Sequence, residues 1–113
     1  MTFQTAQLEQ EAPRFTLPLM DQCVDDGDKV IMKVMFRGNP QPTLTWYFNS
    51  QPIKPSADFQ INVDFKRNES TLTIVEVFPD DEGEYICKAE NPLGTAVTHC
   101  HLFVKCKYMY RSL

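Results

Sequence analysis

The sequence has little of what several functional classes require. Its 113 residues include four glycines, all in predicted turns, and none of them forms a glycine-rich phosphate-binding loop. It has no uninterrupted apolar run of about 18 residues, the length that a membrane-spanning helix needs. Acidic residues outnumber basic ones by 15 to 11, and the net charge of −4 offers no basic face for phosphates. We therefore expect neither nucleic acid nor membrane as a partner.

Length and composition describe one globular domain with short extensions. A chain of this size buries enough apolar surface to fold alone, and 42% hydrophobic with 23% charged residues is ordinary for a globular protein. Residues 1–12 show no strand alternation and are expected to be a linker or N-terminal extension. The domain itself is expected over residues 13–105, followed by a C-terminal extension at 106–113. The first ten residues lack the basic start, apolar stretch and cleavage site of a secretory signal.

Alternation of apolar and polar residues predicts strands throughout the domain. The clearest case is residues 29–36, where one face has Val30, Met32, Val34 and Phe36 and the other has Lys29, Ile31, Lys33 and Met35. The other predicted strands are residues 15–19, 23–24, 43–48, 59–63, 70–77 and 95–105, with one more running up to residue 91. An all-β domain follows from this pattern.

The most informative segment carries four special residues at spacings of two. In Asp81-x-Gly83-x-Tyr85-x-Cys87, an extended chain places all four side chains on one side. A charged turn precedes this segment, and the turn sequence Asn91-Pro92-Leu93-Gly94 follows it. We therefore predict a strand that begins near Gly83, follows a charged turn and ends at the turn at residues 91–94.

A second motif lies upstream, where the turn Gly38-Asn39-Pro40 precedes the lone tryptophan, Trp46, in a predicted strand. Taken in order, the two motifs resemble the I-set immunoglobulin domains, and the resemblance covers about residues 13–105. It implies an immunoglobulin-like two-sheet sandwich with Greek-key connections. The domains most similar in kind are those of titin, kettin, twitchin and palladin, which are modular proteins of the sarcomere and cytoskeleton.

The resemblance also assigns structural roles. Trp46 is expected to plug the core, and Tyr85 to be a corner tyrosine with a buried ring and a hydroxyl bonded to nearby backbone. Asp81 is expected to cap the turn, and Gly83 to permit a tight backbone there. The remaining expected core positions are Val34, Leu72 and Cys87.

The cysteines indicate a compartment. The I-set pattern places a cysteine four residues before the glycine of its Gly-x-Pro turn, but Val34 precedes Gly38 at that distance, so Cys87 lacks its inter-sheet partner. Secreted sandwiches seldom lose a crosslink that stabilises by about 2–4 kcal/mol, whereas a reducing compartment makes it useless. We therefore expect a cytoplasmic location, in the sarcomere or cytoskeleton. The even cysteine count leaves a bond open among Cys23, Cys87, Cys100 and Cys106.

The predicted function is that of a non-enzymatic structural and protein-interaction module, a mechanical spacer and docking surface within a larger sarcomeric or cytoskeletal protein. The resemblance implies that residues 23–24 and 95–105 run side by side in parallel, so that tension shears a row of backbone bonds. Expected partners are neighbouring immunoglobulin or fibronectin-type domains and filament proteins. The alternative is an extracellular adhesion or receptor domain, which the glycosylation triplet Asn68-Glu69-Ser70 favours.

A candidate partner-binding face follows from the outward side of the predicted strands. Several apolar residues on one sheet surface can form a contiguous patch, which marks a partner site, and the edge of the strand at 95–105 can accept a partner strand. Lys105, Lys107 and Arg111 form a small basic end. The candidate face consists of Tyr47, Ile86, Val97, His99, His101 and Phe103.

No catalytic or metal site is expected. His99 and His101 lie two apart on an outward surface, but two ligands are too few for a metal. Catalysis requires a base and an orienting group in a concave site, whereas a sandwich of this size fills its interior with side chains. Cys87 and Cys100 are predicted to point inward, where burial opposes ionisation of a thiol. We therefore expect no enzyme activity, no cofactor and no small-molecule substrate.

Overall fold

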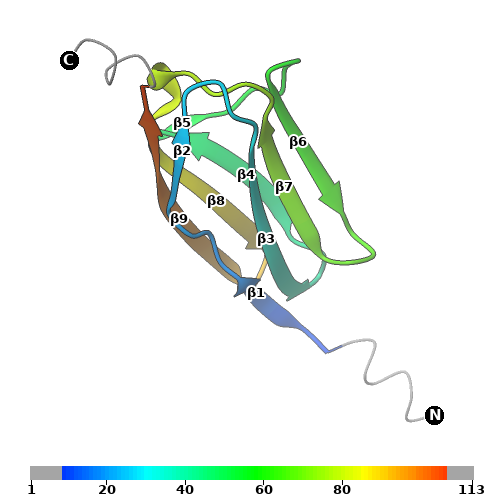
Figure 1. Cartoon of the computed structure of the whole chain (residues 1–113). Helices are drawn as coiled ribbons and strands as arrows, with labels where there is room; N and C mark the ends of the chain where they lie inside the picture. The colour runs from blue at the N-terminus through cyan, green and yellow to red at the C-terminus, as the bar shows by residue number, and fades with distance from the viewer. Residues whose placement is uncertain (1–8, 107–113) are drawn as a thin grey trace.

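Two β-sheets face each other across one core in the computed structural model, which describes residues 9–106 (Figure 1). The first sheet has the strand order β1-β3-β7-β6 and the second the order β2-β9-β8-β4-β5. The elements are β1 (Glu11–Leu17), β2 (Gln22–Asp25), β3 (Val30–Asn39), β4 (Thr43–Phe48), β5 (Gln51–Pro52), β6 (Phe59–Asp64), β7 (Glu69–Ile74), the 3₁₀ turn η1 (Pro79–Asp81), β8 (Gly83–Asn91) and β9 (Gly94–Lys105). The prediction of an all-β, two-sheet immunoglobulin-like sandwich is confirmed.

Alternation along the strands builds the core between the sheets. On β3 the apolar side chains of Val30, Met32, Val34 and Phe36 are buried, and the residues between them are not. Burying each such side chain stabilises the fold by about 1.5–3 kcal/mol relative to its exposure. The other fully buried side chains that join this core include Trp46, Leu72, Ile74, Val77, Tyr85, Cys87 and Leu102.

Trp46 links the two sheets through a buried polar chain. Its indole Nε1–H donates to Oγ of Ser70 at 3.0 Å, and the Ser70 hydroxyl donates to the carbonyl oxygen of Asn62 at 2.9 Å. Trp46 belongs to β4 in the second sheet, whereas Ser70 and Asn62 lie on β7 and β6 in the first. Ser70 is 1% exposed, so its hydroxyl satisfies the tryptophan N–H where water cannot. The sequence prediction treated Ser70 only as a strand residue within a glycosylation triplet.

The corner at the start of β8 is built around Tyr85. The Tyr85 hydroxyl donates to the carbonyl oxygen of Asp81 at 2.6 Å, across the turn η1. The Asp81 carboxylate in turn accepts the backbone N–H of Phe78 at 2.8 Å, which caps the turn. Burial raises the pKa of the Tyr85 hydroxyl far above its usual value, and Asp81 adds to the effect, so the hydroxyl stays a donor.

Gly83 lies in a space that no side chain fits. Its φ of +154° is unusual for other residues, and a Cβ there would lie 2.5 Å from Oδ1 of Asn49 and 2.9 Å from Cε1 of Phe48. Oδ1 of Asn49 accepts the N–H of Glu84 at 2.9 Å. The glycine therefore lets the turn after β4 pack against the start of β8.

Several strand boundaries differ from the sequence predictions, most of all in β1 and β7. The predicted strand 15–19 is wrong at both ends: β1 begins at Glu11, inside the expected linker, and ends at Leu17. Leu19 leaves the sheet because its N–H donates to Oγ1 of Thr98. The predicted strand 70–77 ends at Ile74, because Val77 bonds instead to the Asp28 carbonyl oxygen.

The predicted turn at 49–52 is half as long as expected. Asn49 and Ser50 have φ values of 47° and 71° and make the whole turn, so Gln51 and Pro52 pair with β4 as the short strand β5. At the other border of this sheet, β2 pairs with β9 in parallel, with Cys23 beside Phe103. Parallel pairing of the first and last strands of the sheet was predicted and is confirmed.

We expect Tyr85→Phe to lower the free energy of unfolding by about 1–3 kcal/mol, because the Asp81 carbonyl loses its buried donor. Urea denaturation followed by Trp46 fluorescence measures this change. Tyr47→Phe, at a half-buried tyrosine on the outer surface, serves as the matched control and should change stability by less than about 0.5 kcal/mol. Equal stabilities for the two variants would contradict the role of the corner hydrogen bond.

Candidate functional site

The candidate partner-binding face is the outer surface of the second sheet, formed by β4, β8 and β9. Strand register sets its rows: Tyr47 lies beside Ile86, and Ile86 beside His99. Val97 and Phe103 are 55% and 45% exposed on β9, on the same side as His99. The structure therefore brings all six predicted residues, His101 included, to one sheet surface. Whether this surface binds a partner stays a prediction.

Charged side chains run between the apolar residues of this face. Glu84 lies directly across from His101, and its Oε2 is 3.9 Å from Nδ1 of His99. The His101 ring stacks against Phe103 with 4.3 Å between ring centroids. His99 thus lies near a carboxylate and His101 against an aromatic ring. The sequence placed Glu84 at the border of this face, but only the strand register shows which histidine it approaches.

Lys88 supplies the cation of the face. Its Nζ lies 5.6 Å from the Tyr47 ring centroid and 3.5 Å from Oε1 of Glu90. A hydrogen bond with Tyr47, followed by the charge of Glu90, raises the pKa of Lys88. The Lys88 ammonium group therefore stays charged between Tyr47 and Glu90, and the residue lies beside Val97 in the register.

Two carboxylates accept hydrogen bonds from backbone N–H groups of β9, and the sequence did not predict either contact. Asp21 accepts the N–H of His101 at 2.7 Å, and Glu82 accepts the N–H of Val104 at 2.8 Å. Beyond His101, toward the start of β9, the outward backbone groups of Val97 and His99 make no hydrogen bond to another strand in residues 9–106. The chain between β1 and β2 runs beside this part of the β9 edge, where Leu19 donates its N–H to Oγ1 of Thr98, so a partner strand would have to displace it.

The four cysteines are unpaired and differ sharply in their surroundings. Burial raises the pKa of the Cys87 thiol to about 12 and that of Cys100 to about 11, where Asp21 and Glu84 add to the effect. A thiol that stays protonated is a poor nucleophile and a poor metal ligand. Cys23, by contrast, is exposed on β2 beside Phe103, which only the parallel register reveals.

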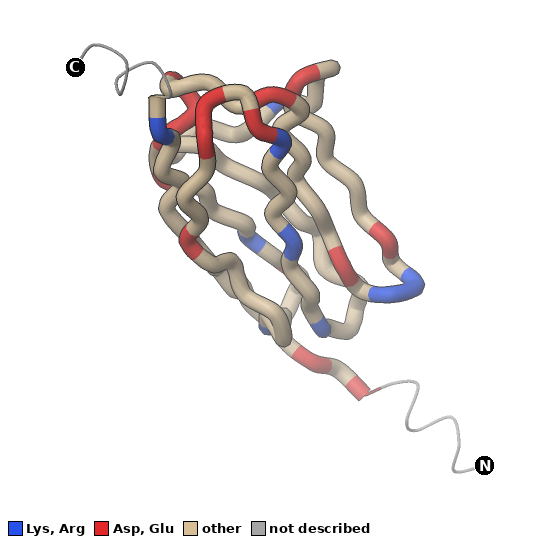
Figure 2. Tube along the Cα trace, viewed as in Figure 1, with Lys and Arg blue, Asp and Glu red and all other residues tan. Residues whose placement is uncertain are grey.

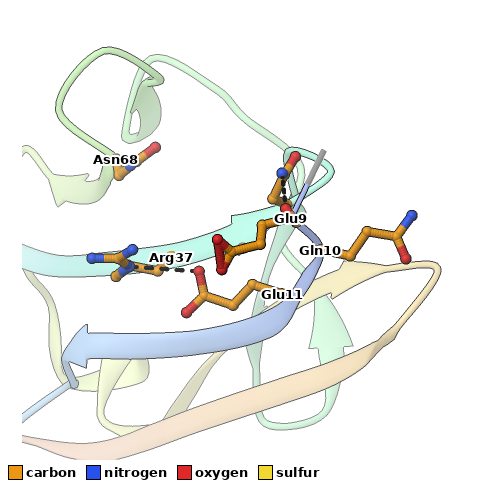
Figure 3. A pocket seen from close by; sticks show the side chains of 7 residues that line it. Glu9, Gln10, Glu11, Arg37 and Asn68 are labelled. Atoms are coloured by element: carbon orange, nitrogen blue, oxygen red, sulfur yellow. Dashed lines mark hydrogen bonds and ion pairs between the residues drawn. The ribbon is translucent and has the colours of Figure 1, made fainter. Parts of the chain in front are cut away.

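A polar hollow of about 720 Å³ lies where the chain enters β1 (Figure 3). The Glu11 carboxylate dominates it, at 3.0 Å from Nε of Arg14 and 3.6 Å from Nε of Arg37. The hydrogen bond from Arg14, opposed by some burial, lowers the pKa of Glu11, so this carboxylate is ionised and neutralised by its partners. The lining residues are Glu9, Gln10, Glu11, Arg37, Gly38, Asn39 and Asn68.

Acidic residues gather at the opposite end of the sandwich, where β9 finishes (Figure 2). Several of these carboxylates hold turns together: Asp28 accepts the N–H of Asp25 at 3.0 Å, while Asp81 and Glu82 accept the bonds described above. Among residues 9–106, no three ligating side chains lie close enough to hold a metal ion. Within the same range, no helix has the length and apolar character to cross a membrane. The predicted basic end lies mostly outside the described residues, since Lys107 and Arg111 fall beyond residue 106.

Comparisons with known proteins agree with this architecture. The family model described as "Immunoglobulin I-set domain" matches residues 13–104. The chain is 43% identical over 94 residues to smooth-muscle myosin light chain kinase of Gallus gallus, covering 83% of the chain and 5% of that protein. It is 37% identical over 97 residues to nexilin of Homo sapiens, covering 85% of the chain and 14% of nexilin. The chain thus spans a small share of these relatives.

Among solved structures, titin domains Z1Z2 in complex with telethonin superpose with a TM-score of 0.83 at 31% identity, covering 88% of this chain and 49% of that one. A two-sheet sandwich with a buried tryptophan, a corner tyrosine and a parallel terminal pair defines the class of immunoglobulin-like domains. Within that class, the chain belongs to the immunoglobulin I-set family, and it is homologous to domains of sarcomeric and cytoskeletal proteins.

We expect thiol-specific labelling of the native protein to modify Cys23 rapidly and to leave Cys87 and Cys100 unmodified. Cys23 is exposed, whereas burial raises the pKa values of the Cys87 and Cys100 thiols and keeps them protonated. Peptide mass spectrometry after labelling at neutral pH measures each site separately. Labelling in denaturant, where all cysteines react, is the control. Rapid native labelling of Cys87 would show that the core opens readily.

Proposed function

We propose that this domain is a non-enzymatic module of a larger sarcomeric or cytoskeletal protein, which carries tension along the chain and docks other proteins. The observation that carries the proposal is the parallel pairing of β2 with β9. Its proposed location is the cytoplasm, because Val34 occupies a buried position in the cluster that holds Cys87, where secreted relatives of this fold place a disulfide.

The mechanical part follows from the direction of the strands. The described chain enters at one end of the sandwich and leaves at the other (Figure 1). Tension on the two ends therefore pulls β2 and β9 in opposite directions along their length. Residues 22–25 pair with residues 102–105, and the N–H of Asp26 adds a bond to the Lys105 carbonyl oxygen at 2.8 Å. Such a row of bonds must break together, because each carries the same load.

The docking part rests on the outer face of the second sheet, formed by β4, β8 and β9. Titin Z1Z2, which this chain resembles, was solved in complex with telethonin. We infer that proteins are the partners here as well, including neighbouring immunoglobulin or fibronectin-type domains and filament proteins. The mixed apolar and charged character of Tyr47, Lys88, Val97 and Phe103 suits a reversible protein contact.

The absence of enzyme activity is also part of the proposal. The thiols of Cys87 and Cys100 are kept protonated, and Glu11 in the polar hollow is neutralised by two arginines. One relative is a kinase, but the matched segment is 5% of that protein. The alternative extracellular role draws on Asn68, which is half-buried in a turn, whereas Ser70 of the same triplet is buried and bonded.

We expect Val24→Pro to lower the force at which the domain unfolds. Backbone direction alternates along a strand, so Val24 directs its N–H to β9 as Asp26 does. A proline at residue 24 removes that donor from the parallel ladder. Single-molecule stretching of the domain, joined in tandem with reference domains of known strength, measures the force.

Two controls isolate the backbone bond. Val24→Ala keeps the N–H and removes most of the side chain, and Cys23→Pro removes an N–H that points away from β9. Both should keep unfolding forces closer to that of the parent. A Val24→Pro domain as strong as the parent would remove the shear mechanism.

For the docking face we expect Phe103→Glu to abolish capture of protein partners from muscle lysate, because a buried carboxylate at the contact is costly. Affinity capture with quantitative mass spectrometry compares it with the parent chain. Ile31→Glu is the matched control, since Ile31 is 52% exposed on the opposite sheet. If both variants capture the same proteins as the parent, the outer face of the second sheet is not the docking site.

A further inference from the structure

The strand β6 is an edge without the usual protection against pairing. Natural edge strands are blunted by shortness, proline, bulges or cations. Among the four edges in residues 9–106, β1 has Pro13 and two register shifts, β2 has four residues, and β5 has two residues that include Pro52. By contrast β6, with the sequence FQINVD, has six residues without proline or glycine, and its one charged side chain, Asp64, lies at its last residue. Figure 1 shows it as the outermost strand of its sheet.

The free backbone groups of β6 belong to Ile61 and Val63. The Asp58 carbonyl accepts the N–H of Val75 on the β7 side at 3.0 Å, and backbone direction alternates along an antiparallel strand. Residues 60, 62 and 64 therefore face β7, whereas 59, 61 and 63 face outward. The outward backbone groups of Phe59 are already hydrogen-bonded to Ser56. Oγ of Ser56 accepts the Phe59 N–H at 3.1 Å, and the Ser56 N–H donates to the Phe59 carbonyl oxygen at 2.8 Å.

We propose that this edge pairs with the same edge of a second copy of the chain, in an antiparallel dimer centred on Asn62. In that register Ile61 lies opposite the partner's Val63, and Val63 opposite the partner's Ile61. Every free N–H and carbonyl of the two residues then gains a bond. Shifting the register by two leaves half of these groups unpaired, so the twofold arrangement about Asn62 is the one that the backbone selects.

Side chains at both ends of the edge fit the same register. Asp58 lies opposite the partner's Lys66, and twofold symmetry repeats this pair. Both side chains are exposed, and neither takes part in an ion pair within residues 9–106. In this register each end of the edge therefore brings a carboxylate of one copy opposite an ammonium group of the other.

The register also gives an exposed aromatic residue a place to pack. Phe65, which is 54% exposed in the β6–β7 turn, falls opposite the partner's Phe59. Phe59 borders an apolar hollow of about 200 Å³, beside Phe48, Pro52 and Ile53. Each copy thus offers one projecting ring and one hollow, which is the self-complementarity that a twofold contact requires.

Sedimentation velocity of the full 113-residue chain tests the proposal, in reducing buffer so that Cys23 cannot crosslink copies. We expect a concentration-dependent monomer–dimer equilibrium. Val63→Pro removes one edge donor per copy and should weaken association about tenfold, whereas Val63→Ala retains the donor and should weaken it much less. His99→Pro places a proline on β9, in the other sheet, and should leave the dimer intact.

A charge exchange tests the register itself. Asp58→Lys and Lys66→Asp should each weaken association about two- to fivefold, and the double variant should restore it. Circular dichroism and Trp46 fluorescence verify that each variant is folded. A chain that stays monomeric up to about 1 mM overturns the proposal. So does a dimer that Val63→Pro leaves unchanged, because it must use another surface.

Discussion

The sandwich depends on one buried hydrogen bond between its sheets, from the Trp46 indole to the Ser70 hydroxyl. Apolar packing brings the two layers together, but it is non-directional and lets them slide. The indole N–H must find its acceptor in a place without water, and Ser70 offers one at a single relative position of β4 and β7. Because Ser70 also bonds to Asn62 on β6, the same chain of bonds fixes three strands. This polar contact sets the relative position of the two sheets, although unlike a disulfide it places no constraint on the unfolded chain.

The direction of the backbone on each strand decides which surfaces are available. On β9, even-numbered residues bond to β8, so the groups of Val97 and His99 point outward until β2 takes over at Leu102. Asp21 covers His101 at the junction between these two parts. On β6, Ser56 plays the corresponding part at Phe59. On β9 the chain between β1 and β2 lies beside the remaining outward groups, whereas on β6 only those of Ile61 and Val63 remain open.

Sequence periodicity predicted the strands, because buried faces obey a period of two, and the resemblance to I-set domains supplied the two-sheet architecture. It separated the inward residues of β3 from the outward ones, and the Asp81 to Cys87 spacing located the corner where Tyr85 bonds to the Asp81 carbonyl. Periodicity missed β5, because a strand of two residues is too short to show alternation. It also extended the β7 prediction to Val77, which is buried but donates its N–H to the Asp28 carbonyl oxygen in a turn. Contacts across strands require a register that the sequence does not state. Glu84 between the histidines and Ser70 beneath Trp46 are contacts of this kind.

The load path and the open edge of β6 lie in different parts of the molecule. Tension enters through β1 and β2 and leaves through β9, so a protein bound across β9 lies on the strand that resists the force. Its binding energy would add to the bonds that must shear, which couples docking to mechanical strength. The edge of β6 is the far border of the other sheet, separated from β9 by β7, β3 and the core. A contact made there can form and dissolve without changing the parallel pair, because none of the bonds that it uses carries load.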